Sequence, residues 1–426
     1  MERMLINQIA KNEGKEVLIQ GRVLNIRNLG NVIFLIVQDY TGVIQVTLEK
    51  NKAKIGEAVA IQGIVKKEPR AKGGFEIQGK KLEVISAIVE DLPFDLSKND
   101  LRLTLTTLLD KRPLTLRHPK IQAIFKVSNI ILENYIRALE EEGFTEIKTP
   151  KILGAATEGG ANFFKVKYFN KEATLAQSPQ FYKQIMMGVF ERVFEVGPVF
   201  RAEPHFTTRH VNEYISLDAE MGFIKDFYDV AKMLNKILKK MFLALKAEGK
   251  QYLDLYKVEL SEVPEEIPCV KLAEIKKIIK EKYKYQVPEG TDIDPKGEEL
   301  AGKYAREKFN SDFIFLTHYP WLDRPFYTMP CKENLEETCG FDLLFKGLEI
   351  ATGSQRIHNY KDLMANMKKK GVKPAGMEFY LDIFKYAMPP HGGWGMGLER
   401  IVQKVLDLKS IKEVILFPRD VKRLSP

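Results

Sequence analysis

Two segments of the chain carry residues suited to nucleotide chemistry. The first, residues 198–221, places Arg201 and Glu203 two positions apart. Asp218 and Glu220 have the same spacing later in the segment. Because alternate side chains of a strand point to the same face, each pair would share a face if the segment forms two strands. An arginine beside several carboxylates suits a small zwitterion bound next to a polyphosphate.

The second segment is rich in glycine and leads into an arginine. Four glycines lie within residues 392–397, and Arg400 follows them. Glycine lets a backbone approach a flat ligand closely, although a structural glycine turn is the alternative. A helix predicted to begin near Leu398 favours phosphate binding, since helix N-termini and arginine both attract phosphate.

A pair of carboxylates in a predicted hairpin indicates a divalent cation. A two-residue turn at Lys346 and Gly347 would join its strands. Asp342 then lies opposite Ala351 and on the same face as Glu349. Two adjacent carboxylates repel each other unless a cation lies between them, and Mg²⁺ carried by a nucleotide takes one or two carboxylates plus phosphate oxygens. A solvated acidic patch is the alternative.

Arg356 lies further along the same hairpin. Strict alternation puts its side chain on the opposite face from Glu349. A bulge at Gly353 would reverse this and bring both side chains to one face.

Two more positions could contact a small substrate. Glu158 precedes two glycines in a predicted loop, from which it could close over an ammonium group. Gln180 and Lys183 are three positions apart at a strand-to-helix junction, so both lie on one side of the first helical turn. A surface lysine is the alternative for Lys183.

The elements that must position these residues indicate an α+β protein. Residues 16 to about 90 contain five short apolar or alternating runs separated by turns, which favours a closed oligonucleotide-binding barrel over another small barrel or sandwich. Helical periodicity begins at Pro119 and strands and helices then follow without a βαβ rhythm, so we expect a mainly antiparallel sheet flanked by helices. The expected boundaries are a barrel at 1–92, a hinge at 93–119 and a second domain at 120–426 with a helical insertion at about 255–310.

Composition is that of a soluble enzyme with a weak preference for polyanions. The 426 residues carry a net charge of +9, and two domains are the default expectation at this length. The cysteines 269, 331 and 339 form no CxxC pair, and free buried thiols are favoured over a link between the last two. We find no membrane span or signal segment and expect a cytoplasmic protein.

Several motifs resemble those of the class II aminoacyl-tRNA synthetases. The stretch GPVFRAEPHFTTRHVNEYISLDAEM is similar to their motif 2, GMGLERI to motif 3, and EEGFTEIKTPKIL to motif 1 with its proline. The predicted barrel places the chain in the subclass that charges Asp, Asn and Lys. TEGGANFF, AQSPQFYKQIMM and FPRDVKRL resemble the aspartate-specific members of archaeal and eukaryotic type. The resemblance covers essentially the whole chain.

The resemblance implies a role for each candidate residue. The ATP-binding residues would be Arg201, Glu203, Arg209, His210, Tyr214, Glu349, Gly397 and Arg400. The aspartate-binding residues would be Glu158, Ser178, Gln180, Lys183, Asp218, Thr352 and Arg356. Asp342, Glu349 and Thr352 would hold Mg²⁺. In the barrel, Phe34, Gln45 and Glu76 would contact anticodon bases, with a core position as the alternative for Phe34.

The implied reaction is ATP-dependent ligation of L-aspartate to tRNA through an aspartyl-adenylate. Arg201 would contact the α-phosphate and Arg400 the γ-phosphate, and with Glu349 they would be the catalytic residues. The resemblance further implies a homodimer with tRNA-Asp as partner. At Leu24 relatives often carry a larger aromatic or histidine that inspects the third anticodon base, so charging of tRNA-Asn stays open.

Three alternatives remain at this point. An asparaginyl-tRNA synthetase is the nearest, and Lys183 counts against it because an amide would leave buried cations unpaired. Relatives that make asparagine from aspartyl-adenylate generally lack the barrel. A non-catalytic RNA-binding paralog is disfavoured by the presence of Arg201, Glu349 and Arg400.

Overall fold

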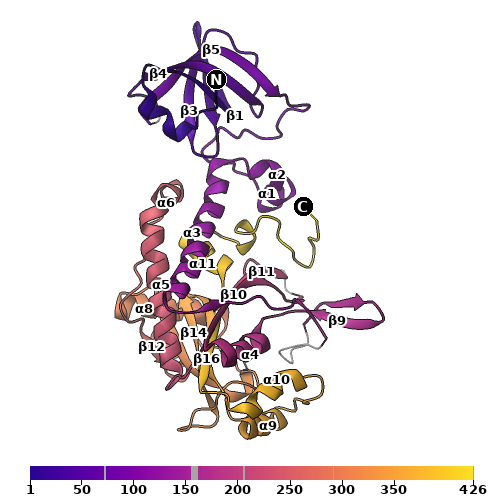
Figure 1. Ribbon diagram of the computed structural model, residues 1–426. Coiled ribbons are helices and arrows are strands. Elements are labelled where there is room, and N and C mark those ends of the chain that lie inside the picture. The colour runs from indigo at the N-terminus through magenta and orange to yellow at the C-terminus, as the bar shows by residue number, and fades with distance from the viewer. Residues whose placement is uncertain (72, 155–161, 205–206, 291, 426) are drawn as a thin grey trace. The chain divides into compact units, whose positions relative to one another are not determined.

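The computed structural model describes residues 1–71, 73–154, 162–204, 207–290 and 292–425. The chain divides into two compact units, shown in Figure 1. One comprises Met1–Thr106 and Pro113–His118, and the other comprises Thr107–Arg112 and Pro119–Pro426. None of the helices in these described ranges is long and apolar enough to span a membrane.

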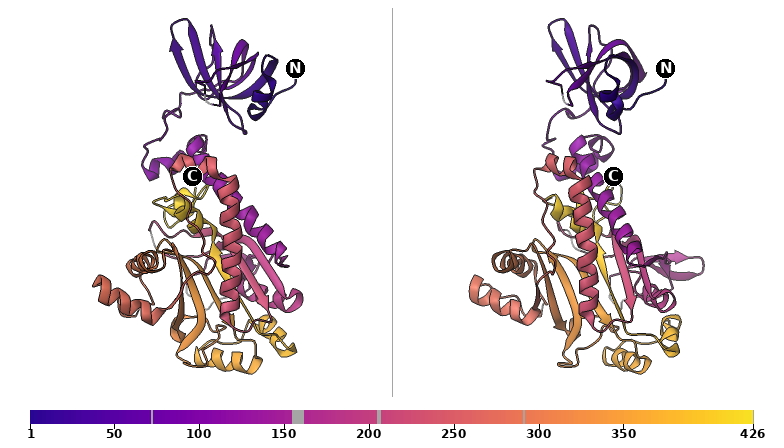
Figure 2. Two further views of the ribbon diagram at one scale, coloured as in Figure 1. Left: turned by 90° about the vertical axis from the view of Figure 1, so that its left-hand side faces the viewer. Right: turned by 60° about the vertical axis from the view of Figure 1, so that its left-hand side comes forward.

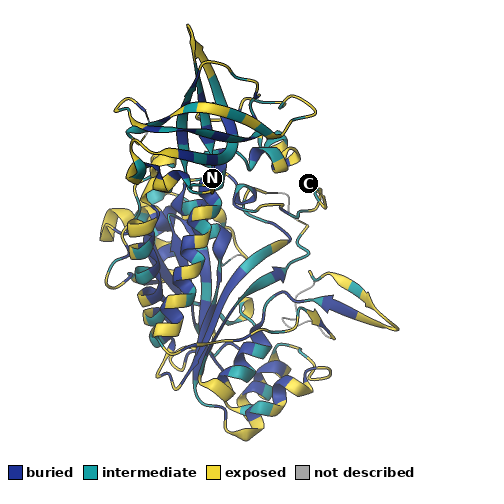
Figure 3. Ribbon diagram, turned by 45° about the horizontal axis from the view of Figure 1, so that its top comes forward, coloured by how far each residue is buried: buried dark blue, intermediate teal, exposed yellow. Residues whose placement is uncertain are grey.

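The first unit is a closed barrel of five strands, as the sequence predicts. Its strands are β1 (Glu16–Leu29), β2 (Val32–Gln38), β3 (Val43–Leu48), β4 (Ala58–Lys67) and β5 (Phe75–Ser86), in the order β1-β2-β3-β5-β4. Alternate residues of β3 and β4 are buried, so one face of each strand fills the barrel (Figure 3). The 3₁₀ helix η1 (Ile6–Asn12) adds two isoleucines to this core. Two short helices, α1 (Leu105–Asp110) and α2 (Arg112–Thr115), follow the last strand.

The second unit is built on an eight-stranded sheet in the order β12-β13-β14-β15-β16-β11-β10-β6. The bounds of its strands are β6 Thr145–Glu146, β10 Arg192–Phe200, β11 Glu213–Gly222, β12 Cys269–Lys271, β13 Phe313–Pro320, β14 Glu337–Phe345, β15 Leu348–Arg356 and β16 His391–Gly397. The pairs at the two edges are parallel and the inner pairs are antiparallel, which confirms the mainly antiparallel prediction. A small sheet of β7 (Ile152–Leu153), β9 (Lys171–Leu175) and β8 (Lys165–Tyr168) lies outside it.

Helices cover the two faces of the large sheet differently. The helices α3 (Pro119–Glu141), α5 (Phe227–Glu248) and α11 (Leu398–Val405) share one apolar core with inward residues of the central strands (Figures 1 and 2). On the opposite face, α7 (Leu272–Tyr283) and α8 (Pro295–Phe309) pack on β13 and β14. There too, α4 (Gln180–Phe190), α9 (Tyr360–Lys369) and α10 (Glu378–Asp382) form a separate cluster. Residues of the middle strands line a cavity on that face.

Two predictions of local structure are wrong. The glycine-rich segment is not only a close approach, because residues 391–397 form β16 in the middle of the sheet. The sequence also predicts a strand at residues 325–329, whereas these residues form a turn with a single bridge from Thr328 to Arg356. The predicted insertion contains α7 and α8 after the short helix α6 (Lys250–Tyr256), and its β12 extends the large sheet.

Candidate active site

A cavity of about 360 Å³ opens on the sheet face that α3 and α5 leave uncovered. Polar residues from the middle strands, α4, the first turn of α11 and the loops before β11 and β14 line it. Of the candidate residues, those lining it are Ser178, Gln180, Lys183, Arg201, Glu203, Arg209, His210, Tyr214, Asp218, Glu349, Thr352, Arg356, Gly397 and Arg400. Glu158 lies outside the described residues. Fourteen positions scattered over more than half of the chain thus meet in one cavity.

A β-bulge decides which side chains of β15 face the cavity. Leu344 pairs with Glu349, but the register then shifts, and Asp342 pairs with Thr352 and not with Ala351 as predicted. The extra residue is Ile350. The bulge therefore brings Thr352 and Arg356 to the same face as Glu349, and the predicted reversal is confirmed at a different residue from the Gly353 that we expected.

The glycines of β16 make room for the acidic side chains of the adjacent strand. A Cβ on Gly393 would lie 2.2 Å from Glu220 Oε2, and one on Gly395 would lie 3.2 Å from Asp218 Oδ1. Gly395 pairs with Asp218 on one side and with Thr352 on the other. The floor of the cavity is therefore bare backbone, as the glycine pattern indicated.

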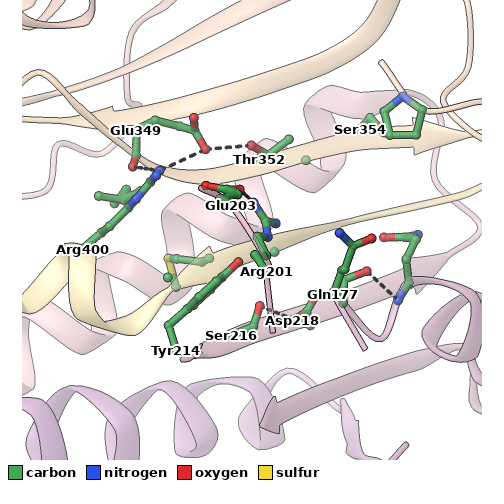
Figure 4. A pocket seen from close by; sticks show the side chains of 18 of the residues that line it. Gln177, Arg201, Glu203, Tyr214, Ser216, Asp218, Glu349, Thr352, Ser354 and Arg400 are labelled. Carbon is green, nitrogen blue, oxygen red and sulfur yellow. Dashed lines mark hydrogen bonds and ion pairs between the residues drawn. The ribbon is translucent and has the colours of Figure 1, made fainter. Parts of the chain in front are cut away.

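One end of the cavity gathers arginines around Glu349. Arg400 Nη1 donates to the Glu349 carbonyl at 2.8 Å and lies 3.4 Å from its carboxylate, which also accepts from Thr352 Oγ1 at 3.1 Å (Figure 4). The guanidinium of Arg201 lies over the ring of Tyr214, 5.6 Å from its centroid. Burial opposes ionisation of Glu349, but Arg400 and Arg324 outweigh it and lower its pKa. Cations and an ionised carboxylate in one place suit a polyphosphate and its metal ion.

Asp342 does not line this cavity, because its carboxylate is paired with an arginine. Arg324 Nη1 and Nη2 donate to its two carboxylate oxygens at 3.0 and 2.7 Å, and Arg324 also lies over the ring of Tyr319. Burial and the nearby Glu349 raise the pKa of Asp342 despite this arginine. The part of the chain that the structure describes contains no cluster of three His, Cys, Asp or Glu able to hold a metal. The two carboxylates that the sequence predicted to share a cation therefore have different surroundings: Glu349 faces the cavity, whereas Asp342 is paired with Arg324.

The other end of the cavity holds four buried charges in balance. Lys183 Nζ lies 3.0 Å from Asp218 Oδ1 and 3.5 Å from Glu220 Oε2. Arg356 contacts Glu220 through Nε at 2.9 Å. Lys183, predicted from a pattern equally typical of a surface lysine, is only 1% exposed. Two cations and two carboxylates give no net charge, which suits a ligand that also carries both signs.

Sequence reasoning did not assign Glu220 to the site. Its carboxylate is fully buried, and although burial opposes its ionisation, Arg356 and Lys183 lower its pKa. The alternation of Asp218 and Glu220 was the available signal, because residues two apart in a strand share a face. Glu220 lies behind the lining, and the polar lining residues that the prediction did not include are Gln177, Ser216, Asp323, Arg324, Tyr327, Thr328, Ser354 and Glu399.

A neutral hydrogen-bond chain supports the charged end. Gln184 Nε2 donates to His391 Nε2 at 2.9 Å, while His391 Nδ1 donates to the Pro389 carbonyl at 2.8 Å. Gln184 Oε1 accepts from Gln180 and from the Tyr380 hydroxyl. Burial lowers the pKa of His391 to about 4, so the imidazole is neutral at pH 7 and adds no charge to the site.

The contribution of Glu399 to the stability of the fold depends on whether its carboxyl group is protonated. It is buried at the start of α11, and its Oε1 accepts from the backbone N–H of Ile215 at 3.0 Å. Burial raises the pKa of Glu399 from 4.5 to about 7. The folded state therefore holds the proton more tightly than the unfolded state, so the stability that Glu399 contributes is fully present below pH 4.5 and is lost as the pH rises through 7, by about 3 kcal/mol.

Replacing Glu399 with glutamine should remove this dependence while keeping the acceptor for Ile215. We expect the free energy of unfolding in urea to decline between pH 4.5 and 8 in the wild type by about 3 kcal/mol more than in Glu399→Gln. Equal slopes for the two proteins over that range would contradict the assignment.

The barrel presents a groove on its outer face. Phe34, Gln45 and Glu76 line it, and Gln45 Nε2 donates to Glu76 Oε2 at 2.8 Å. Phe34 is half-buried and lies outside the barrel core, so the side chain belongs to the groove and the core alternative is wrong. Leu24 is buried at the bulge of β1. An aromatic ring beside polar side chains suits stacking and edge contacts with single-stranded bases.

Known proteins resemble the chain in both units. Residues 104–421 match the family of tRNA synthetases class II (D, K and N), and residues 17–85 match the OB-fold nucleic acid binding domain. The chain belongs to the class II aminoacyl-tRNA synthetases. The letters D, K and N stand for aspartate, lysine and asparagine, so the family match leaves the amino acid open among three.

Three members of this synthetase family illustrate the similarity. The chain is 44% identical to the aspartate–tRNA(Asp/Asn) ligase of Thermus thermophilus, with all of both chains covered. It is 41% identical to the aspartate–tRNA(Asp) ligase of Pyrococcus horikoshii, covering 99% of this chain and 98% of the relative. The structure of asparaginyl-tRNA synthetase from Pyrococcus horikoshii complexed with asparaginyl-adenylate has a TM-score of 0.93 at 31% identity, with all of both chains covered.

Proposed function

We propose that this synthetase ligates L-aspartate to tRNA-Asp in an ATP-dependent reaction through an aspartyl-adenylate. The observation that carries the choice of aspartate is the pair of buried cations, Lys183 and Arg356, at one end of the cavity. Similar proteins at 41% to 44% identity are named aspartate–tRNA ligases, which supports the same choice.

The charges of the cavity suit each part of aspartic acid. Asp218 would bind its ammonium group, and Lys183 and Arg356 would bind its side-chain carboxylate. Asparagine would present an uncharged amide to these cations and would lose the charged hydrogen bonds that the aspartate carboxylate accepts from them. A buried polar mismatch of this kind rejects an analogue by roughly 10⁴-fold. Lysine would place a cation against two cations.

The first step needs positioning and charge stabilisation more than proton transfer. The α-carboxylate of aspartate is ionised at pH 7 and would attack the α-phosphorus in line, which expels pyrophosphate. Arg201 and Arg400 would stabilise the negative charge that spreads over the phosphates, each contributing on the order of 3 kcal/mol. Tyr214, which stacks against Arg201, would lie against the adenine.

The residues present fit a magnesium ion delivered with ATP. Glu349 and Thr352 face the cavity together and would hold it, and Asp342 would join them only on leaving Arg324. Bound there, the ion would neutralise phosphate charge. One protein carboxylate is enough, because Mg²⁺ keeps several waters and takes its remaining ligands from phosphate oxygens.

The choice of tRNA would rest with the groove of the barrel. Phe34 would stack on an anticodon base, and the Gln45 amide and the Glu76 carboxylate, which are hydrogen-bonded to each other, would contact base edges. At position 24, where relatives often inspect the third base, Leu24 offers no polar group and is buried. We therefore propose that tRNA-Asn is charged as well, in a cytoplasmic enzyme that acts as a homodimer.

Charging purified tRNA-Asp and tRNA-Asn side by side tests this proposal. We expect both to accept aspartate with kcat/KM values within about tenfold of each other, a difference of about 1.4 kcal/mol, because Leu24 offers no polar contact that would distinguish the third base. Charging with asparagine in place of aspartate would overturn the proposed substrate. Charging of tRNA-Asp alone would contradict only the proposal that tRNA-Asn is also a substrate. Sedimentation as a monomer would contradict the proposed homodimer.

A further inference from the structure

Two cysteines lie against each other beside the substrate cavity. Cys331 follows the turn that lines the cavity, and Cys339 lies in β14. Their sulfur atoms are 2.8 Å apart, and neither residue belongs to the catalytic or binding set described above. The third cysteine, Cys269, lies in β12. The chain thus provides a matched thiol outside the pair.

Backbone hydrogen bonds fix both cysteines independently of their side chains. Cys331 N–H donates to the Glu337 carbonyl at 2.9 Å, and Cys339 N–H donates to the Met329 carbonyl at 2.8 Å. A bridge between Pro330 and Thr338 lies between these two bonds. The two segments therefore run antiparallel, and their cysteines are diagonal neighbours on one face of the strand pair.

The same segment also supports the substrate end of the cavity. Thr328 forms a bridge with Arg356, and Met329 N–H donates to the Gln355 carbonyl at 3.0 Å. The ring of Tyr327 lies 5.4 Å from the Arg356 guanidinium. Residues 327–331 thus connect the end of β15, which carries Arg356, to the start of β14.

We propose that Cys331 and Cys339 are a modification site, at which a small-molecule disulfide oxidises the pair to an intramolecular disulfide. The cross-link would hold residues 327–331 on β14 and leave the cavity open. Because the two sulfur atoms already lie in contact, bond formation needs little movement of Thr328 or Arg356. The proposal concerns this surface of the second unit and does not depend on which amino acid is charged.

The exchange has a defined order. Cys339 is partly exposed whereas Cys331 is 1% exposed, so the small disulfide reaches Cys339 first. A hydrogen bond from the Cys331 thiol lowers the pKa of Cys339, which favours its thiolate. That thiolate attacks one sulfur of the small disulfide and releases one small thiolate.

The second exchange closes the cross-link. The Cys331 thiol releases its proton to water, and its sulfur attacks the Cys339 sulfur of the mixed disulfide. A second small thiolate leaves. Two protein thiols and one small disulfide thus give one protein disulfide and two small thiols, with two electrons passing to the small molecule.

Glutathione disulfide is the probe for the test on the full-length enzyme. Trypsin cuts after Lys332, which lies between the two cysteines, so their peptides separate unless the disulfide joins them. We expect a joined peptide pair that dithiothreitol releases, and a loss of about two hydrogen masses per chain. The joined pair should persist in Cys269→Ser and be absent in Cys331→Ser and Cys339→Ser.

Function and stability are measured on the same samples. We expect oxidation to raise the thermal unfolding midpoint of the second unit by about 3 °C, as for a short closed loop in a large domain. Aspartate-dependent pyrophosphate exchange should stay within twofold. Separate peptides after oxidation, or a stable glutathione adduct on Cys339, would overturn the site, and a loss of exchange in the cross-linked enzyme would overturn the open cavity.

Discussion

Replacement of Arg201 with alanine is expected to lower aspartate-dependent pyrophosphate exchange by about 10³-fold. Its guanidinium lines the cavity, lies over the ring of Tyr214 and is 3.9 Å from the carboxylate of Glu203. Negative charge grows on the α-phosphate as pyrophosphate leaves, and one fixed donor at such a position is worth roughly 10²–10³ in kcat.

The measurement should divide the loss between kcat and the KM for ATP. We expect kcat to carry most of it, because the contact strengthens as the transition state forms. Arg306→Ala is the matched control, since Arg306 lies on α8 with its side chain 61% exposed and outside the cavity. Full exchange activity in Arg201→Ala would exclude the assigned role.

Replacement of Lys183 with methionine is expected to affect stability and substrate binding together. The ammonium group balances Asp218 and Glu220 and also donates to the Trp394 carbonyl at 2.9 Å. Removing one partner of a buried ion pair costs about 3–5 kcal/mol of unfolding free energy. Because Lys183 would also bind the substrate carboxylate, kcat/KM for aspartate should fall by roughly 10⁴-fold.

A second lysine separates these two effects. Lys151 pairs with the buried Glu195 at 2.8 Å but does not line the cavity. Lys151→Met should therefore lower the free energy of unfolding and leave the KM for aspartate within about threefold of the wild type. A normal KM for aspartate in a folded Lys183→Met enzyme would contradict the proposed recognition of the carboxylate.

Strong local patterns made most of the fold predictable from the sequence. The five barrel strands alternate or run apolar between turn residues, and α3 and α5 carry apolar residues at helical spacing. The strand β16 was not predicted, because glycine has a low strand propensity. Its pairing depends on β11 and β15, which are distant in sequence and supply both sets of hydrogen bonds.

The sequence predicted the site residues that belong to recognisable motifs. It did not predict the ion pairs between residues that only the folded chain brings together. Resemblance to known motifs assigned Arg201 and Arg400, and both line the cavity. It did not indicate that Arg324 holds Asp342, because this pair links the turn before β14 to β14 itself. Nor did it place Glu220 between two cations, a position that only the folded sheet creates.

The bulge at Ile350 shifts the alternation of side chains in β15, so residues before it and residues beyond it reach the cavity independently. Glu349, before it, serves the arginine-rich end of the cavity, while Arg356, beyond it, serves the end with balanced charges. Without the bulge, strict alternation of the same residues would turn Ala351 and Gly353 toward the ligand and Arg356 to the face that α3 and α5 cover. Deletion of Ile350 would instead restore regular pairing and keep Glu349, Thr352 and Arg356 on the cavity face. Sequence change on either side of the bulge can therefore alter one substrate contact without moving the other.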